Sequence, residues 1–339
     1  MSPAGDPYRR SPIRSDQKVR DLPVHPPSSV PTKASAQVGG VLGDEDAIYR
    51  DVLQALADGF GGVILAGPPG TSKSWYAERI AQKLADGDPS RIRLTQFHPS
   101  YQYEDFIEGY VPDGSTFKPA PKHLLLISNA ARESKEANED KTYVLVIDEL
   151  SRSDPARVFG EALTYVEASM RNKSFFVASG RQTSIPDNLV LLATMNTFDR
   201  GVDDVDAAFD RRMAKIEMDP DAAIAEQFLM ASGMDPILRS RVLKFFRWLQ
   251  YLPEKHAHLG HTFFMGLKTE EDLDRRWRYQ LVHVFRKAYR LNDDGFRKVQ
   301  DAWLRVFPTP VEEPEVADAA SDAGASSTSN GAGSVELVN

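Results

Sequence analysis

Hydrophobic residues fall into short apolar runs that alternate with amphipathic stretches over the first two thirds of the chain. The amphipathic stretches have helical spacing and predict helices. The apolar runs predict buried strands, because continuous apolar strands are typical of parallel sheets that are covered on both faces. The strands predicted from apolar runs cover residues 63–66, 143–147, 189–194 and 214–218, and a further strand signal covers residues 91–97. The predicted helices cover residues 46–58, 77–84 and 122–136. This alternation predicts a doubly wound α/β domain with its chemistry at the carboxyl ends of the strands.

After Pro220 the pattern becomes helical. Apolar residues recur there at the spacing of a helix face, as in Val242, Phe245, Phe246 and Leu249. We therefore expect two domains, an α/β domain over residues 44–219 and a helical domain over residues 220–307 that acts as a lid.

The two ends of the chain differ from both domains in composition. Residues 1–43 are rich in proline, and residues 308–339 are of low complexity. Neither end has enough apolar residues to bury a core, so we expect two disordered tails.

The composition narrows the class of protein. The 339 residues carry a net charge of −8, which argues against a dedicated nucleic-acid-binding domain but leaves room for a local basic face. The absence of cysteine excludes disulfides, thiolate zinc sites and cysteine nucleophiles, and it fits a reducing compartment. No signal peptide and no apolar run near 18 residues is found. We expect a cytoplasmic protein that does not contact a membrane.

A glycine- and proline-rich loop lies between the first predicted strand of the sheet and a predicted helix, which is the order of a phosphate-binding P-loop. Backbone N–H groups of such a loop and the positive end of the helix dipole hold a triphosphate. Lys73 is expected to reach the β- and γ-phosphates, and the Ser74 hydroxyl to ligate Mg²⁺. The predicted nucleotide-binding residues of the loop are Gly67, Pro68, Pro69, Gly70, Thr71, Ser72, Lys73 and Ser74.

Ser72 stands where a P-loop usually has a glycine before the lysine. If that position needs a positive φ, the serine is strained there. The alternative interpretation of the stretch is a turn followed by a helix with a surface lysine.

Two carboxylates end the apolar run at residues 143–147. Asp148 is expected to contribute to the Mg²⁺ site and to nucleotide binding, and Glu149 is expected to polarise the attacking water. Together with the upstream P-loop, these residues form a Walker B arrangement. The alternative is a pair of solvated carboxylates at a strand end.

Polar residues also follow the run at residues 189–194. Asn196 ends this strand, where its amide could contact the γ-phosphate or the water. Arg211 and Arg212 are candidates for an arginine that stabilises the transferring phosphoryl group across a subunit boundary. The alternative role of either arginine is a structural ion pair with Asp203, Asp204, Asp206 or Asp210.

Five segments of the chain together resemble the McrB-type AAA+ motor domain, in the dynein-related branch of AAA+ proteins. These segments are Gly67–Ser74, Phe97–Tyr110, Val146–Arg152, Phe159–Leu163 and Ala193–Arg200. The resemblance implies a P-loop NTPase fold with a parallel sheet flanked by helices and a C-terminal helical lid domain. It also implies a sensor role for Asn196, a hexameric ring, ATP or GTP as substrate with Mg²⁺ as cofactor, and a hairpin near residues 175–185.

The same resemblance implies a McrC-like endonuclease as partner in restriction of foreign DNA, with DNA contacted only through the complex. The chain departs from the pattern of this family in two places. The motif Asp210-Arg211-Arg212-Met213 stands where the family often has three arginines and a phenylalanine, and only a predicted tail precedes the motor where relatives carry a recognition module. Two alternatives stay open: a MoxR-like ATPase that remodels a protein partner, and a nucleotide-gated scaffold with little turnover. The motifs do not decide between ATP and GTP.

Two further groups of side chains are singled out by spacing. Tyr101, Tyr103 and Phe106 could pack on a neighbouring subunit or the lid, but at least one is expected in the core. His256, His258 and His261 could suggest a metal site, but without a thiolate or a carboxylate in register we expect a lid histidine that contacts nucleotide or stabilises a turn. By resemblance, the segment 260–265 belongs to the lid.

Overall fold

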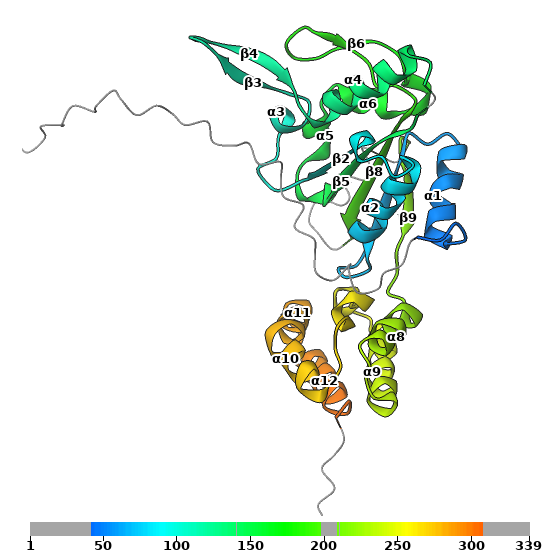
Figure 1. Ribbon diagram of the computed structural model, residues 1–339. Coiled ribbons are helices and arrows are strands. Elements are labelled where there is room, and N and C mark those ends of the chain that lie inside the picture. The colour runs from blue at the N-terminus through cyan, green and yellow to red at the C-terminus, as the bar shows by residue number, and fades with distance from the viewer. Residues whose placement is uncertain (1–41, 140, 198–208, 210, 308–339) are drawn as a thin grey trace, which may run out of the picture.

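The computed structural model describes residues 42–139, 141–197, 209 and 211–307. Among these, one large sheet has the strand order β2-β5-β8-β1-β9, and all of its neighbouring strands are parallel (Figure 1). Its strands are β1 (Gly62–Gly67), β2 (Ile92–Gln96), β5 (Tyr143–Asp148), β8 (Leu189–Asn196) and β9 (Ala214–Glu217). Each strand predicted from an apolar run is present, and the predicted α/β class is confirmed.

Helices cover both faces of the sheet. One face is covered by α1 (Ala47–Ala57) and α2 (Lys73–Leu84), and the other by α3 (Tyr103–Phe106), α4 (His123–Glu136), α5 (Pro155–Phe159) and α6 (Ala162–Val166). Short 3₁₀ turns lie at η1 (Pro89–Arg91), η2 (Leu150–Arg152) and η3 (Ala168–Met170). The three helices predicted in this region are all found.

The apolar runs of β1, β5 and β8 are continuous because these central strands pack on both faces. Val63 and Leu65 of β1 belong to the core under α1 and α2, whereas Ile64 and Ala66 belong to the core under α3–α6. Side chains alternate between the faces of a strand, so a strand buried on both sides is apolar at nearly every position.

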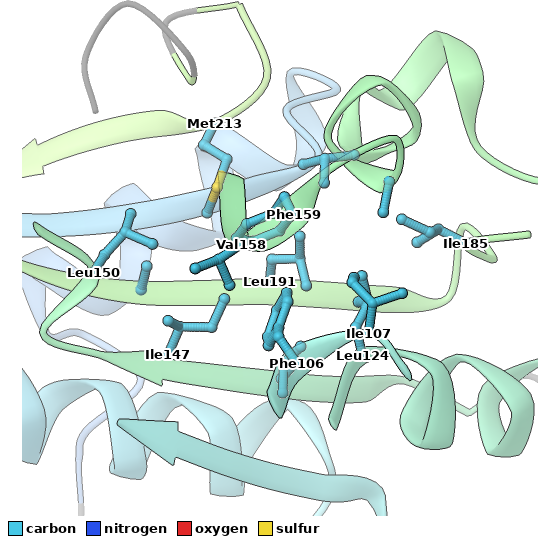
Figure 2. Packing of buried hydrophobic residues seen from close by; sticks show 14 of the residues in the cluster. Phe106, Ile107, Leu124, Ile147, Leu150, Val158, Phe159, Ile185, Leu191 and Met213 are labelled. Carbon is cyan, nitrogen blue, oxygen red and sulfur yellow. The ribbon is translucent and has the colours of Figure 1, made fainter. Parts of the chain in front are cut away.

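The core under α3–α6 is built from large side chains. Figure 2 shows Phe106, Leu124 and Phe159 packed against Ile147 and Leu191 of the sheet. The ring centroids of Phe106 and Phe159 lie 4.7 Å apart.

The predicted core role of the aromatic motif is confirmed for Tyr101 and Phe106, which are both buried. The Tyr101 ring stacks on Phe97 at 4.7 Å. Tyr103 is half-buried, and its hydroxyl donates a hydrogen bond to Glu161 at 2.7 Å. A contact of these residues with a neighbouring subunit stays a prediction.

Two hairpins stand apart from the large sheet. The predicted hairpin near residues 175–185 is present as the antiparallel pair β6 (Phe175–Phe176) and β7 (Gln182–Thr183). A second hairpin, β3 (Glu108–Asp113) and β4 (Thr116–Pro121), was not predicted and projects from the α/β region (Figure 1). Its strands hold Pro112, Pro119 and Pro121, which argue against a strand in sequence-based reasoning because proline lacks the ladder N–H group.

The chain after β9 forms helices around a hydrophobic core of its own. Aromatic side chains pack on one another in this core, with Trp277 stacked on Trp303 at 5.1 Å and Phe245 edge-on to Trp303 at 5.0 Å. The helices are α8 (Ala222–Ala231), α9 (Pro236–Leu249), α10 (Glu270–Arg276), α11 (Val282–Ala288) and α12 (Asp293–Leu304), with 3₁₀ turns η4 (Lys255–Ala257) and η5 (His261–Phe264) and a π-helical turn η6 (Trp277–Leu281). We call this part, from α8 to α12, the helical region. The domain boundaries stay predictions.

Aspartates mark where several helices begin. The side chains of Asp46, Asp221 and Asp235 accept hydrogen bonds from backbone N–H groups in the first turns of α1, α8 and α9. In the described part of the chain, no helix is both long and apolar enough to span a membrane.

The register of the sheet brings the ends of its strands to one edge. Gly67 at the end of β1 pairs with Asn196 of β8, and Gln96 at the end of β2 pairs with Asp148 of β5. The helical region lies beyond this carboxyl edge in Figure 1. The edge and the helical region together frame the candidate site.

Candidate functional site

The predicted P-loop connects β1 directly to α2. Its backbone takes a left-handed conformation at two residues, Gly70 with φ +82° and Ser72 with φ +64°. Ser72 therefore has the strained conformation considered from the sequence. The Thr71 hydroxyl donates a hydrogen bond to the Pro68 carbonyl at 3.0 Å across the loop. Gly67 is sterically required, because a Cβ atom there would lie 2.2 Å from the Met218 carbonyl oxygen.

Lys73 is the first residue of α2, and its side chain turns back to the loop. The ammonium group donates hydrogen bonds to the carbonyls of Gly67 at 2.9 Å and Pro68 at 2.7 Å. Its charge therefore lies at the mouth of the loop, where the positive end of the helix dipole also points. This geometry argues against an ordinary surface lysine after a turn.

Hydroxyl groups from two elements converge on Asp148 at the end of β5. Ser74 Oγ donates to Asp148 Oδ1 at 2.8 Å, and Thr194 Oγ1 donates to the same oxygen at 2.6 Å. The structure thus brings together Ser74 and Asp148, the two residues predicted for Mg²⁺. Carboxylate and hydroxyl oxygens are the ligands that Mg²⁺ prefers, so this donor set fits the metal.

Glu149 follows Asp148 in a left-handed conformation, with φ +58°. Its backbone N–H donates to Thr194 Oγ1 at 3.0 Å, and its carboxylate accepts a hydrogen bond from Arg152 Nε at 3.2 Å. The side chain is partly exposed at the carboxyl edge of the sheet. This position fits the predicted interaction with a water molecule.

Two residues near these carboxylates were missed in the sequence. Thr194 belongs to an apolar run and was interpreted only as part of a strand. A hydroxyl near the carboxyl end of a buried strand is nevertheless a signal of a functional residue. Glu78 of α2 lies near Asp148, and burial together with that carboxylate raises the pKa of Glu78. The carboxyl edge is therefore richer in acidic groups than the motifs indicate.

Asn196 lies beside the P-loop, as predicted, because β8 pairs with β1 along its whole length. The next residue, Thr197, donates its N–H to the Gly67 carbonyl at 3.3 Å. The sensor role of Asn196 stays a prediction.

The structure does not bring Arg211 and Arg212 to the P-loop of their own chain. The Arg212 carbonyl accepts a hydrogen bond from Gly61 N–H at 2.9 Å, which places this backbone at the amino end of β1. The P-loop follows the other end of this six-residue strand, about 20 Å away. The predicted alternative partners Asp203, Asp204, Asp206 and Asp210 lie outside the described residues.

The segment Gly260–Phe264 of the helical region packs directly on the P-loop. Gly260 N–H donates to the Pro69 carbonyl at 3.1 Å, and Thr262 N–H donates to the Gly70 carbonyl at 3.0 Å. A Cβ atom on Gly260 would lie 2.0 Å from the carbonyl carbon of Gly70, so glycine is required for this approach.

His261 is the buried polar side chain of this segment, in which the ring of Phe264 is also buried. Its Nε2 lies 2.9 Å from Ser72 Oγ, and its Nδ1 accepts a hydrogen bond from Asp221 N–H at 3.2 Å. Burial lowers the pKa of His261 to about 4, and the nearby Lys73 acts in the same direction, against Asp221, which raises it. The ring is therefore neutral at neutral pH.

The other histidines of the predicted cluster do not join His261 in a metal site. His258 Nε2 lies 2.9 Å from the Leu252 carbonyl, within the helical region. No group of three or more histidine, cysteine or acidic side chains that could hold a metal ion is found in the described part. A turn-stabilising or nucleotide-contacting role for a histidine of this segment stays a prediction.

Residues 62–213 match the family model described as AAA domain, dynein-related subfamily. The chain is similar to the EcoKMcrB subunit of the Type IV methyl-directed restriction enzyme of Escherichia coli, with 31% identity over 237 residues, 65% of this chain and 51% of the relative. It is also similar to the YdiS component of the Type II restriction enzyme BsuMI of Bacillus subtilis, with 26% identity over 186 residues, 44% of this chain and 54% of the relative.

A third relative is the Pachytene checkpoint protein 2 homolog of Danio rerio, with 24% identity over 184 residues, 53% of this chain and 40% of the relative. The chain thus spans about half the length of the two restriction-system relatives and less of the third.

Proposed function

Residues 62–213 are an AAA domain of the dynein-related subfamily, as the motifs predicted, and from this premise we propose that the chain is a magnesium-dependent nucleoside triphosphatase of a McrB-like restriction system. The observation that carries the proposal is the convergence of Ser74 and Thr194 on one oxygen of Asp148, at the mouth of the P-loop. A phosphate-binding loop joined to a magnesium-binding carboxylate supplies what binding of a triphosphate with its metal needs, and Glu149 beside them supplies the group that hydrolysis needs to orient water.

The binding step uses groups that the fold already orients. Backbone N–H groups of residues 67–74 and the α2 dipole hold the phosphates, and Lys73 moves from the loop carbonyls to the β- and γ-phosphates. Ser74 and Asp148 would hold Mg²⁺, which would supply positive charge to neutralise the phosphate oxygens.

The hydrolysis step is in-line attack of water on the γ-phosphate. Glu149 orients the water from the end of β5, and Asn196 contacts the γ-phosphate from the end of β8. An arginine from a neighbouring subunit, Arg211 or Arg212, stabilises the charge that develops. The position of Arg212 at the amino end of β1 supports action across a subunit boundary rather than within one chain.

Action across a boundary requires an assembly, and we propose the hexameric ring that the McrB resemblance implies. The names of two relatives, a restriction enzyme subunit and a restriction enzyme component, support a role in DNA restriction. The proposed partner is a McrC-like endonuclease, with DNA contacted through the complex. A cysteine-free chain supports work in a reducing compartment such as the cytoplasm.

The test is steady-state hydrolysis of ATP and of GTP, with the purified protein alone and with the product of the adjacent gene. Turnover that this product stimulates supports the restriction motor. Turnover that does not respond to this product supports the alternative function, remodelling of another protein partner.

The shared site is tested by mixing two inactive variants. Lys73→Ala lacks the P-loop cation, and Arg212→Ala lacks a candidate for the arginine from the neighbouring subunit. In a mixed ring, some interfaces combine an intact P-loop with an intact arginine, so mixing restores part of the activity. Arg211→Ala is the matched comparison, and only the variant of the acting arginine complements Lys73→Ala. If neither variant does, action across the boundary is contradicted.

A further inference from the structure

His261 links the helical region to the P-loop through two hydrogen bonds. Asp221, at the other end of one of them, caps α8 by accepting hydrogen bonds from Ala223 N–H at 2.6 Å and Ile224 N–H at 3.2 Å. The imidazole is thus anchored at the start of the first helix of the helical region, and its other nitrogen faces Ser72.

The proton of the neutral ring can be assigned from its partners. Asp221 N–H is a donor only, so Nδ1 must be the unprotonated nitrogen that accepts. Nε2 then carries the hydrogen and donates to Ser72 Oγ at 2.9 Å. Burial favours this neutral form, because it lowers the pKa of His261 to about 4.

The residue that receives this hydrogen bond is the one that departs from the P-loop pattern. Ser72 has φ +64°, a conformation that glycine adopts without strain and serine does not. A glycine in this place would offer no hydroxyl to His261. Because α2 begins at the next residue, Lys73, the contact restrains the backbone immediately before the phosphate-binding lysine.

We propose that His261 is a positioning residue for nucleotide binding, and that Ser72 and His261 form a matched pair through which the helical region holds the P-loop in its binding conformation. This inference rests on the proposed nucleoside triphosphatase function. Neighbouring contacts act in the same direction, since Gly260 and Thr262 donate their backbone N–H groups to P-loop carbonyls on either side of His261.

The experiment compares full-length variants in binding of a fluorescent ATP or GTP analogue and in steady-state hydrolysis. His261→Phe keeps a ring against Phe228, whose centroid lies 5.9 Å from that of His261, but removes both ring nitrogens. His261→Gln keeps a polar side chain with an N–H donor. His258→Phe is the matched control, because it removes a hydrogen bond inside the helical region without touching the P-loop.

We expect His261→Phe to raise the dissociation constant of the analogue about three- to ten-fold, the effect expected from loss of the hydrogen bond to the P-loop residue Ser72, with a smaller change in kcat. His261→Gln recovers most of the affinity, and His258→Phe binds like the wild type. In a Ser72→Gly background, His261→Phe has no further effect on affinity, because the hydroxyl that it acts through is gone.

Three results would overturn the inference. One is unchanged affinity in His261→Phe; another is an equal loss in the Ser72→Gly background; the third is a loss that His258→Phe reproduces. If the wild-type protein binds neither analogue and hydrolyses neither ATP nor GTP, the proposed function itself fails and this inference with it. Wild-type binding with an insensitive His261→Phe overturns the inference alone.

Discussion

The P-loop and the segment Gly260–Phe264 meet at the same site but are built in opposite ways. The P-loop is one stretch between β1 and α2, and its internal hydrogen bonds join residues at most six positions apart. The segment from the helical region reaches it across about 190 positions of sequence, as the 189-residue separation of Ser72 and His261 indicates. One part of the site is local, and the other depends on how two regions of the chain pack.

The two parts of the site also have different tasks: one supplies the chemical groups, and the other positions the P-loop. Lys73, Ser74, Asp148 and Glu149 lie on the strand ends and the P-loop helix, and their side chains supply charge and metal ligands. The segment Gly260–Phe264 supplies backbone donors, a close glycine contact and one neutral imidazole. We therefore expect substitutions in the first group to affect turnover most and substitutions in the second to affect nucleotide affinity.

Among substitutions that leave the P-loop intact, the largest effect is expected from Glu149→Gln, which keeps the shape of the side chain but removes the charge that orients water. We predict a fall in kcat of about 10²- to 10⁴-fold with little change in nucleotide affinity. Single-turnover and steady-state hydrolysis measure the fall. Glu136→Gln, at the exposed end of α4, is the control and should turn over like the wild type. Normal turnover in Glu149→Gln would remove this residue from the mechanism.

Gly260→Ala disturbs the contact between the segment Gly260–Phe264 and the P-loop. The added methyl group meets the Gly70 backbone at 2.0 Å, so the segment must move away from the P-loop. Overpacking of this kind costs about 1–3 kcal/mol, and we predict a loss of nucleotide affinity of about five- to 150-fold. Gly43→Ala is the control, because its nearest heavy atom would lie 4.0 Å away. Wild-type affinity in Gly260→Ala would show that the contact does not support binding.

A smaller effect is expected from Thr194→Val, because the Thr194 hydroxyl contacts Asp148 and Glu149 but is not itself expected to bind the metal or the water. The change removes the donor to Asp148 and the acceptor for Glu149 N–H, while Thr194→Ser keeps both. We predict that kcat/KM falls about three- to ten-fold and that more Mg²⁺ is needed for half-maximal activity. A Mg²⁺ titration of both variants checks this. Equal behaviour of the valine and serine variants would assign no role to the hydroxyl.

The features that could be predicted from the sequence are the local ones, and those that depend on packing of distant segments could not be predicted. The strands and the P-loop were predicted, because apolar runs buried on both faces and a loop between a strand and a helix are local signals. The β3–β4 hairpin was missed, because Pro112, Pro119 and Pro121 argue against strands. Thr194 was missed because its burial in an apolar run hides its hydroxyl, and only the register of β8 against β5 places it beside Asp148.

Non-local features were out of reach for a different reason. The strand order β2-β5-β8-β1-β9 is set by pairing between distant residues, which single-segment patterns do not encode. The spacing of His256, His258 and His261 drew attention to the right segment, but it could not reveal that His261 contacts Ser72. The serine in the P-loop looked like a departure from the motif, and only the fold supplies its partner.

The most direct test of the central claim is hydrolysis of ATP and GTP by the wild-type protein, by Lys73→Ala and by Lys83→Ala. Both lysines lie on α2, but Lys83 is at its far end, paired with Asp44 and away from the loop. We predict Mg²⁺-dependent turnover of at least one nucleotide by the wild type and by Lys83→Ala, and none by Lys73→Ala. Turnover that survives in Lys73→Ala, or its absence from the wild type with the adjacent gene product present, would contradict the account.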